Sequence, residues 1–490
     1  MLLIHNTMTG KKEAFEPLVP GKVGMYVCGV TVYDECHLGH ARSAIVFDAI
    51  RRYLQYRGFA VNYVRNFTDV DDKIIARANQ EAEDWTAIVA RYIAAFSRDM
   101  ERLSVTVPNQ EPRATEHMPE IISMVSGLID KGVAYEMEGD VYYRIEGFAD
   151  YGCLSHRKLD DMLAGARVEV DERKEHPMDF ALWKASKSGE PAWESPWGKG
   201  RPGWHIECSA MSVKHLGETF DIHGGGEDLI FPHHENEIAQ SQAFTGKPFA
   251  RYWIHNGFVT IHAEKMSKSL GNTFTIRALF DASGYTETVT AEIIRYFVLS
   301  AHYRSPIDVQ DDSFQESKRA LNNVYDLLLR LEEAKATPES ANVSDADIDA
   351  ILTKLQQGFE IAMDDDFNTP EAIGEIQRVR AEINACLAKG ISGATAVKAQ
   401  DKLRNIGQVL GLFQAQAKNW EFGEKAAWTS ELTYQPSSKL SEADIEAMVG
   451  ERKKARTNKD WKRSDEIRDN LAQQGVILED RPDGTTRWKK

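Results

Sequence analysis

The sequence has few cysteines and no long hydrophobic run, and each absence excludes a class of protein. Five cysteines in 490 residues are too few for a disulfide framework. No stretch approaches the roughly 18 apolar residues that a membrane-spanning helix needs. Residues 1–12 also contain no apolar run of signal-peptide length. We therefore expect a cytoplasmic protein without a membrane segment.

An overall positive charge is also lacking. The formal net charge is −16, which excludes a general polyanion binder. The charge is uneven, however, because residues 451–490 contain 12 Lys and Arg against 8 Asp and Glu, which leaves −20 for residues 1–450. A basic end on an acidic body allows contact with one specific nucleic acid, although a solvated helix surface would give the same counts.

Strand and helix patterns alternate in the first half of the chain. Residues 24–32 and 61–67 have the composition of buried strands, and residues 41–58 between them have apolar positions at helical spacing. Residues from 71 and 84–103 also predict helices. The alternation resumes with a helix over 203–216, a strand over 219–223, a glycine turn and a helix over 232–244. This pattern indicates an α/β fold with a parallel sheet covered on both faces.

Changes in this pattern suggest the domain boundaries. The alternation breaks near 108–113, and residues 184–202 are rich in Lys, Gly, Ser, Pro and Trp. Beyond 306 four amphipathic stretches predict a helix bundle, over 312–333, 345–363, 369–389 and 394–412. A basic helical end with a small hairpin near 482–484 follows. We expect five segments. Residues 1–115 and 201–305 form the first and second halves of the sheet domain, and residues 116–200 form an insertion between them. Residues 306–415 form the bundle, and residues 416–490 form a C-terminal module.

A histidine motif, His37-Leu38-Gly39-His40, lies where the first strand passes into the first helix. Ligands bind at this carboxyl edge in open α/β sheets, and a helix N-terminus offers free N–H groups to phosphate. Gly39 allows a phosphate or a base to approach the backbone closely. His37 and His40 can donate hydrogen bonds to charge that develops on phosphate oxygens. Taken alone, two histidines near a helix start also serve as caps or surface residues.

Two further segments have chemistry suited to a nucleotide. The Lys265-Met-Ser-Lys-Ser269 segment lies in a polar, glycine-flanked stretch, where Lys265 and Lys268 can neutralise a triphosphate. The predicted glycine turn, 223–228, ends in Asp228, which can accept hydrogen bonds from ribose hydroxyls.

Four residues have the chemistry of a zinc site: Cys28, Cys208, His233 and Glu237. His233 and Glu237 are spaced i, i+4, so a helix places both on one face. Two thiolates, an imidazole and a carboxylate suit Zn²⁺. Because the cysteines are far apart in sequence, both could instead be small buried core residues. His234 and Glu235 are expected to point to a different face.

Together these motifs resemble the cysteinyl-tRNA synthetase family of class I aminoacyl-tRNA synthetases, over nearly the whole chain. One motif departs from the family pattern, because Leu38 stands where the family usually has Ile; an apolar side chain is kept. The resemblance is carried by residues 28–34 (CGVTVYD) with HLGHAR, by 203–208 (GWHIEC), 223–228 (HGGGED) and 231–237 (FPHHENE), and by the KMSKS segment.

The resemblance implies a cysteine–tRNA ligase with a Rossmann-like catalytic domain, an insertion, a helical bundle and a small anticodon-binding module. It implies as substrates L-cysteine, ATP with Mg²⁺ and tRNA(Cys), and a monomeric state. It also implies one Zn²⁺ that binds the substrate thiolate. The implied roles are metal binding for Cys28, Cys208, His233 and Glu237; catalysis for His37, His40, Lys265 and Lys268; ATP binding for these four with Gly39 and Asp228; and cysteine binding for Thr68 and Trp204.

The chemistry of this assignment is consistent. Serine differs from cysteine by one atom, and an apolar pocket discriminates poorly between the two amino acids. A bond between a metal and the cysteine sulfur discriminates between them much better. We therefore expect no editing domain. Two alternatives remain open: a ligase that transfers cysteine to an amino sugar, and a non-catalytic regulator that binds zinc and nucleotide.

Overall fold

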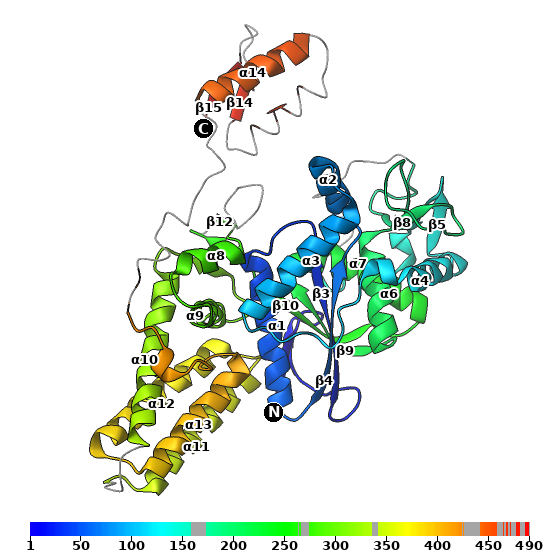
Figure 1. Cartoon of the computed structure of the whole chain (residues 1–490). Coiled ribbons are helices and arrows are strands. Elements are labelled where there is room, and N and C mark those ends of the chain that lie inside the picture. Colours follow the sequence, from blue (N-terminus) through cyan, green and yellow to red (C-terminus); the bar gives the residue numbers. More distant parts are fainter. Residues whose placement is uncertain are drawn as a thin grey trace.

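A parallel sheet of four strands forms the centre of the molecule, in the order β10–β9–β3–β4 (Figure 1). The strands are β3 (Lys22–Thr31), β4 (Ala60–Thr68), β9 (Phe220–Gly226) and β10 (Ala250–Asn256). The structure is a computed structural model that describes residues 1–157, 173–262, 264–265, 274–335, 342–423, 425, 442–457, 464, 467–468, 471, 477–480 and 486–489.

Helices cover both faces of this sheet, as the sequence predicts. The alternation of side chains along a strand divides β3 between two cores: Val27 faces one core, and Cys28 faces the other. The first core includes α1 (Leu38–Tyr56) and α3 (Trp85–Arg102). The second includes α4 (Met118–Asp130), α6 (Trp204–Leu216) and α7 (Glu235–Thr245). The sheet edge is therefore accessible where the strands end.

An antiparallel sheet lies between the two halves of the parallel sheet in sequence. Its order is β5–β6–β7–β8. It begins after α4, and α6 follows its last strand directly, so it is an insertion into the sheet domain. The strands are β5 (Ala134–Met137), β6 (Asp140–Tyr143), β7 (Phe180–Ala185) and β8 (Gly200–Pro202).

A group of long helices follows the sheet domain (Figure 1). Hydrogen bonds from side chains begin several of them: Ser344, for example, accepts from the Asp347 N–H ahead of α11. The helices are α10 (Ser313–Ala334), α11 (Asp345–Asp364), α12 (Thr369–Lys389) and α13 (Gly393–Leu410), reached through α8 (Ile276–Ser283) and α9 (Glu287–Leu299). The sequence thus predicts all four bundle helices to within a few residues.

The remaining elements are short. Near the C-terminus, β14 (Ile477–Asp480) pairs antiparallel with β15 (Thr486–Lys489) after α14 (Glu442–Thr457), while the predicted turn at 482–484 lies outside the described residues. The others are β1 (Leu3–Asn6), β2 (Lys11–Ala14), α2 (Asp72–Glu81), β11 (Val259–Ile261), β12 (Glu264–Lys265) and β13 (Ile307–Val309). No helix in the described ranges is long and apolar enough to cross a membrane.

A buried ion pair joins α9 to α1. Arg295 of α9 donates to the Asp48 carboxylate over 2.7 Å, and the two side chains are 0% and 1% exposed. The same guanidinium donates to the carbonyl oxygens of Leu103 and Leu410, at the ends of α3 and α13. One side chain therefore connects the sheet domain to the helical bundle.

The glycine turn predicted at 223–228 is wrong. Gly224 to Gly226 are the last residues of β9, and a short 3-10 helix, Glu227–Leu229, follows. A Cβ added at Gly224 would lie 2.3 Å from the Phe47 ring of α1, so glycine here serves close packing of helix on strand.

Candidate active site

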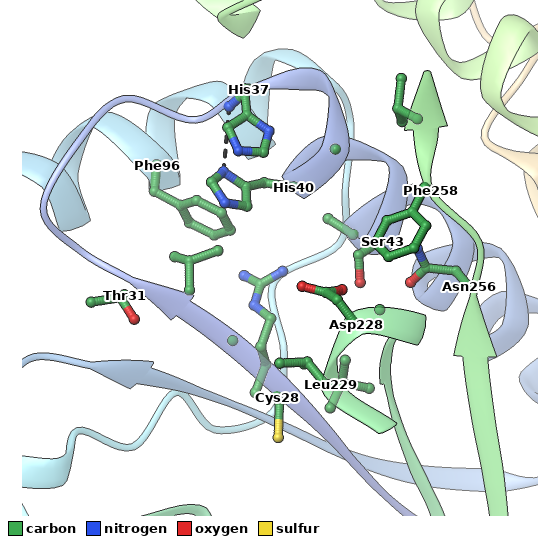
Figure 2. Close-up of a pocket in the computed structure, with 18 of the residues that line it drawn as sticks. Cys28, Thr31, His37, His40, Ser43, Phe96, Asp228, Leu229, Asn256 and Phe258 are labelled. Atoms are coloured by element: carbon green, nitrogen blue, oxygen red, sulfur yellow. Dashed lines mark hydrogen bonds between the residues drawn. The ribbon is translucent and has the colours of Figure 1, made fainter. Parts of the chain in front are cut away.

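A cavity of about 570 Å³ opens at the carboxyl edge of the parallel sheet. Figure 2 shows His37 and His40 on one side of it and Asp228 opposite. Three residues predicted to act on ATP or on cysteine also line it: Gly39, Asp228 and Trp204. Residues that are far apart in sequence thus surround one space large enough for a ligand.

The histidine motif forms the N-terminus of α1. His37 is the residue that precedes the first turn, and its ring stacks on that of His40 with centroids 3.6 Å apart. The His37 N–H points at the His40 Nδ1 over 3.4 Å. The first N–H groups of a helix have no partner within the helix, so the N-terminus of α1 directs a partial positive charge toward the cavity. Both residues line the cavity at this end of α1.

A second group of residues lies behind Cys28, whose sulfur points away from the histidine pair in Figure 2. The Cys28 Sγ lies 3.5 Å from His233 Nε2 and 3.3 Å from Glu237 Oε1. His233 and Glu237 are 2.9 Å apart, and both are almost completely buried. Three of the four predicted zinc ligands therefore converge on one point.

The fourth predicted ligand, Cys208, belongs to the same group. Hydrogen bonds with the Cys28 thiol, and with His233, outweigh burial and lower the pKa of Cys208 to about 6. Burial and the neighbouring Cys208 raise the pKa of Cys28 well above its usual value. Two neighbouring cysteines with an imidazole and a carboxylate beside them are a donor set suited to a soft divalent cation.

The charge on Glu237 is stabilised by two histidines. Burial would raise its pKa, but His223, which donates over 2.9 Å, and His233 lower it to about 2. Burial would likewise lower the pKa of His233, and Glu237 and Cys208 instead raise it to about 10. The residues present fit zinc in donor type, burial and convergence.

His234 also reaches this group, which corrects the expectation that it points elsewhere. Its Nε2 lies 3.3 Å from the Cys28 Sγ and its Nδ1 lies 2.8 Å from His255 Nε2. Residues three apart share a helix face as well as residues four apart, so His234 accompanies Glu237. Within 4.8 Å of one another lie donor atoms of Cys28, His233, His234 and Glu237. Cys208 and His234 therefore compete for the fourth position.

Glu235 points away from the cluster, as expected. Its carboxylate accepts backbone N–H groups of Gly152 and Ser155.

The remaining predicted residues differ in position. Trp204 stacks on His233 with ring centroids 4.2 Å apart, and so connects the candidate metal site to the cavity. Thr68 ends β4 and is buried at 2% exposure, but it does not line the cavity. Lys265 lies in β12, where its backbone alone is described, and Lys268 is outside the described residues.

Comparisons with known proteins identify the family to which the chain belongs. Residues 14–319 match the family described as tRNA synthetases class I (C) catalytic domain. Residues 358–414 match the DALR domain, and residues 440–488 match the cysteinyl-tRNA ligase anticodon binding domain. The sequence is 53% identical to the cysteine–tRNA ligase of Geobacter metallireducens, over 100% of this chain and 99% of that protein. The chain belongs to the cysteine–tRNA ligase family.

Other relatives agree with this assignment. The cysteine–tRNA ligase of Thermodesulfovibrio yellowstonii is 52% identical over 99% of both chains. Among solved structures, methionyl-tRNA synthetase of Mycobacterium tuberculosis in complex with methionyl-adenylate superposes with a TM-score of 0.59. That match has 17% identity and covers 79% of this chain and 89% of the other, so it shows the shared class I fold. The α/β fold class expected from the sequence is confirmed.

Sequence reasoning missed the histidines that surround the predicted zinc ligands. His205 Nδ1 lies 2.9 Å from His233 Nδ1, and His255 Nε2 lies 2.8 Å from His234 Nδ1. Burial, with His223, lowers the pKa of His255 to about 3. These residues lie on α6 and β10, and their sequence spacing carries no metal-site signal. His205 lies within the quoted GWHIEC motif, which was the one available indication.

Proposed function

We propose that this family member activates L-cysteine with ATP and transfers it to tRNA(Cys), with a zinc ion that selects the substrate thiol. The observation that carries the proposal is one cavity that borders both the histidine motif and Cys28 of the thiol, imidazole and carboxylate cluster. The class I family match and the cysteine–tRNA ligase relatives support the reaction.

In the first step the cysteine carboxylate attacks the α-phosphorus of ATP, which forms cysteinyl-adenylate and releases pyrophosphate. His37 and His40 donate to the phosphate oxygens as charge develops, at the positive end of α1. Lys265 and Lys268 neutralise the pyrophosphate, and Mg²⁺ accompanies ATP. Positioning and charge stabilisation thus carry the step without a side-chain nucleophile. In the second step a hydroxyl of the terminal adenosine of the tRNA attacks the acyl carbon and AMP leaves.

Four residues would hold the zinc: Cys28, Cys208, His233 and Glu237. When bound, zinc supplies a Lewis acid that binds a thiolate far more strongly than the neutral hydroxyl of serine. Glu237 keeps its charge through His223 and His233. We assign the fourth position to Cys208 rather than His234, because thiolate is the softer donor.

The substrate contacts form the next part of the proposal. Trp204 forms the wall of the cysteine pocket next to His233, and Asp228 accepts hydrogen bonds from the adenylate ribose or the substrate amine. Thr68 is proposed as a further cysteine contact.

The proposal also assigns a role to each segment of the chain. We assign 1–115 and 201–305 to the catalytic domain, 116–200 to the insertion, 306–415 to tRNA stem binding and 416–490 to anticodon binding. The cytoplasmic location and the monomeric state expected from the family resemblance belong to the same proposal.

The decisive experiment uses the full chain with radiolabelled cysteine, ATP and total tRNA. Acid-precipitable cysteine is expected, together with cysteine-dependent ATP–pyrophosphate exchange. Serine in place of cysteine should give neither signal. Exchange without any charging would favour transfer of cysteine to another acceptor, and absence of both would contradict the proposal.

Metal content tests the ligand set. Cys28→Ser and His233→Ala should lose zinc and cysteine activation together, whereas Cys386→Ser, a half-buried cysteine of α12, should keep both. Cys208→Ser should lose zinc and His234→Ala should retain it. The reverse pattern at these last two positions would assign the fourth ligand to His234, and full activity in a zinc-free variant would refute thiol selection by the metal.

A further inference from the structure

Arg65 is a buried cation of the cavity to which the proposed mechanism gives no role. It lies on β4, opposite Val27 of β3, and is 6% exposed. It lines the cavity together with Phe96 and His40. A buried guanidinium at the edge of a ligand cavity requires partners for its five N–H groups.

Part of this requirement is met within the protein. The Arg65 Nη2 donates to the Glu111 Oε1 over 2.7 Å, and the guanidinium lies 5.0 Å from the centre of the Phe96 ring. Among the described residues, the buried Nε and Nη1 atoms of Arg65 have no hydrogen-bond partner. An ion pair with Glu111 alone would explain one donor and leave these two unsatisfied, which is costly in a buried position.

The sheet face on which Arg65 lies indicates which substrate group it meets. Paired residues of neighbouring strands point to the same face, so Arg65 shares the face of Val27 and α1, whereas Cys28 points to the opposite face. Phe96, the ring next to the guanidinium, lines the cavity together with His40 (Figure 2). Arg65 is therefore on the phosphate side of the cavity and not on the thiol side.

The charges around the cavity agree with an anionic partner. Among the described lining residues, Asp228 is the one carboxylate, while Arg65 and Lys73 carry permanent positive charge. Lys73 is exposed and lies over the ring of Tyr33, so it is solvated. Arg65 is the shielded cation, and arginine presents parallel N–H groups that match phosphate oxygens.

We infer that Arg65 donates hydrogen bonds to the α-phosphate of ATP as cysteine attacks it. The inference rests on the proposed function, because it adds a donor to the first step of that reaction. As the carboxylate oxygen bonds to phosphorus and the bond to pyrophosphate breaks, charge on the α-phosphate oxygens is shared with the buried guanidinium. Glu111 accepts from the far end of the guanidinium and lies outside the cavity lining.

The test measures cysteine-dependent ATP–pyrophosphate exchange in Arg65→Gln, Arg65→Lys and Glu111→Gln. Loss of charge-assisted hydrogen bonds predicts that kcat falls about 10- to 100-fold in Arg65→Gln. The KM for cysteine and the zinc content should change less than about twofold, because the thiol site is on the other face of the sheet. Arg65→Lys keeps the positive charge but loses the parallel N–H groups of the guanidinium, so an intermediate loss in kcat is expected.

Glu111→Gln is the matched control, because it weakens the same ion pair without touching the cavity. It should retain kcat within about threefold of the unsubstituted protein. A loss in Glu111→Gln equal to that in Arg65→Gln would overturn the inference in favour of a structural ion pair, and so would an Arg65→Gln protein with unchanged kcat. If Arg65→Gln does not fold, Arg65→Lys decides, and an unaltered kcat there overturns the inference. Absence of exchange in the unsubstituted protein would instead refute the proposed function.

Discussion

Replacement of Arg295 by methionine should loosen the junction between α1 and α9. Arg295 is fully buried, and its guanidinium serves the Asp48 carboxylate and the carbonyl oxygens of Leu103 and Leu410. Methionine fills a similar volume but leaves these buried acceptors with fewer donors. Breaking a buried pair by removing one partner typically costs about 3–5 kcal/mol. This magnitude corresponds to a change of about 150- to 5,000-fold in the opening equilibrium.

The matched control is Arg52→Met. Arg52 binds the same Asp48 carboxylate over 2.8 Å, but its side chain is 21% exposed. Water can therefore replace much of the lost interaction with Asp48, and we expect the substitution to cost about 1 kcal/mol of stability or less. Both arginines bind Asp48 and also donate to backbone carbonyl oxygens, Arg52 to those of Ser104 and Gln408, so the main difference between the two variants is burial.

The assay is hydrogen exchange of the amides in α1 and α9, read by mass spectrometry, because a chain of several domains need not unfold in one transition. Protection in both helices should fall far more in Arg295→Met than in Arg52→Met. Burial would raise the pKa of Asp48, but Arg295 and Arg52 hold it below its usual 3.8. The charge of Asp48 therefore contributes stability above pH 3.8 that is lost as the pH falls through the lower value of the folded state. The difference between Arg295→Met and the unsubstituted protein should shrink in that range, and equal protection in both variants at pH 7 would refute the reasoning.

Three further outcomes are expected. Burial raises the pKa of Asp99 to about 6, so its ionised form destabilises the fold as the pH rises from 3.8 to 6. Asp99→Asn should therefore raise the thermal midpoint at pH 7 and leave it unchanged below pH 3.8. A Cβ at Gly29 would lie 1.7 Å from the Asn66 carbonyl oxygen, so Gly29→Ala should displace β3 and lower zinc content and activity, whereas Gly374→Ala, with open space around it, should be neutral in both assays. Removal of the metal by a chelator should lower cysteine-dependent exchange at least about tenfold, with recovery on addition of zinc; exchange that survives complete metal removal would contradict the assignment.

The sequence predicts the sheet domain and the bundle well, because both depend on local periodicity. The helix 369–389 matches the structure in both bounds, and 345–363 differs by one residue. The glycine segment of β9 was misjudged because glycine is typical of turns, and the packing of Phe47 that requires it is not visible in sequence.

The candidate site was predictable where residues recur in short motifs and hidden where they meet through the fold. Cys28, His233 and Glu237 could be grouped by ligand chemistry, and the structure brings them together. The approach of His234 to Cys28 and the support from His255 depend on how β10 lies beside β9, which no sequence spacing expresses. The partners of Arg65 are likewise a matter of tertiary packing.

The candidate metal site joins residues that the ribosome makes at very different times. Cys28 and His233 are 205 positions apart, which at about 5–20 residues per second means about 10–40 s of synthesis. During that interval the Cys28 thiol exists without the histidine and carboxylate that surround it in the finished protein. The proposed zinc site can therefore be complete only after the insertion and β9 have been made, so metal binding would follow synthesis of Glu237.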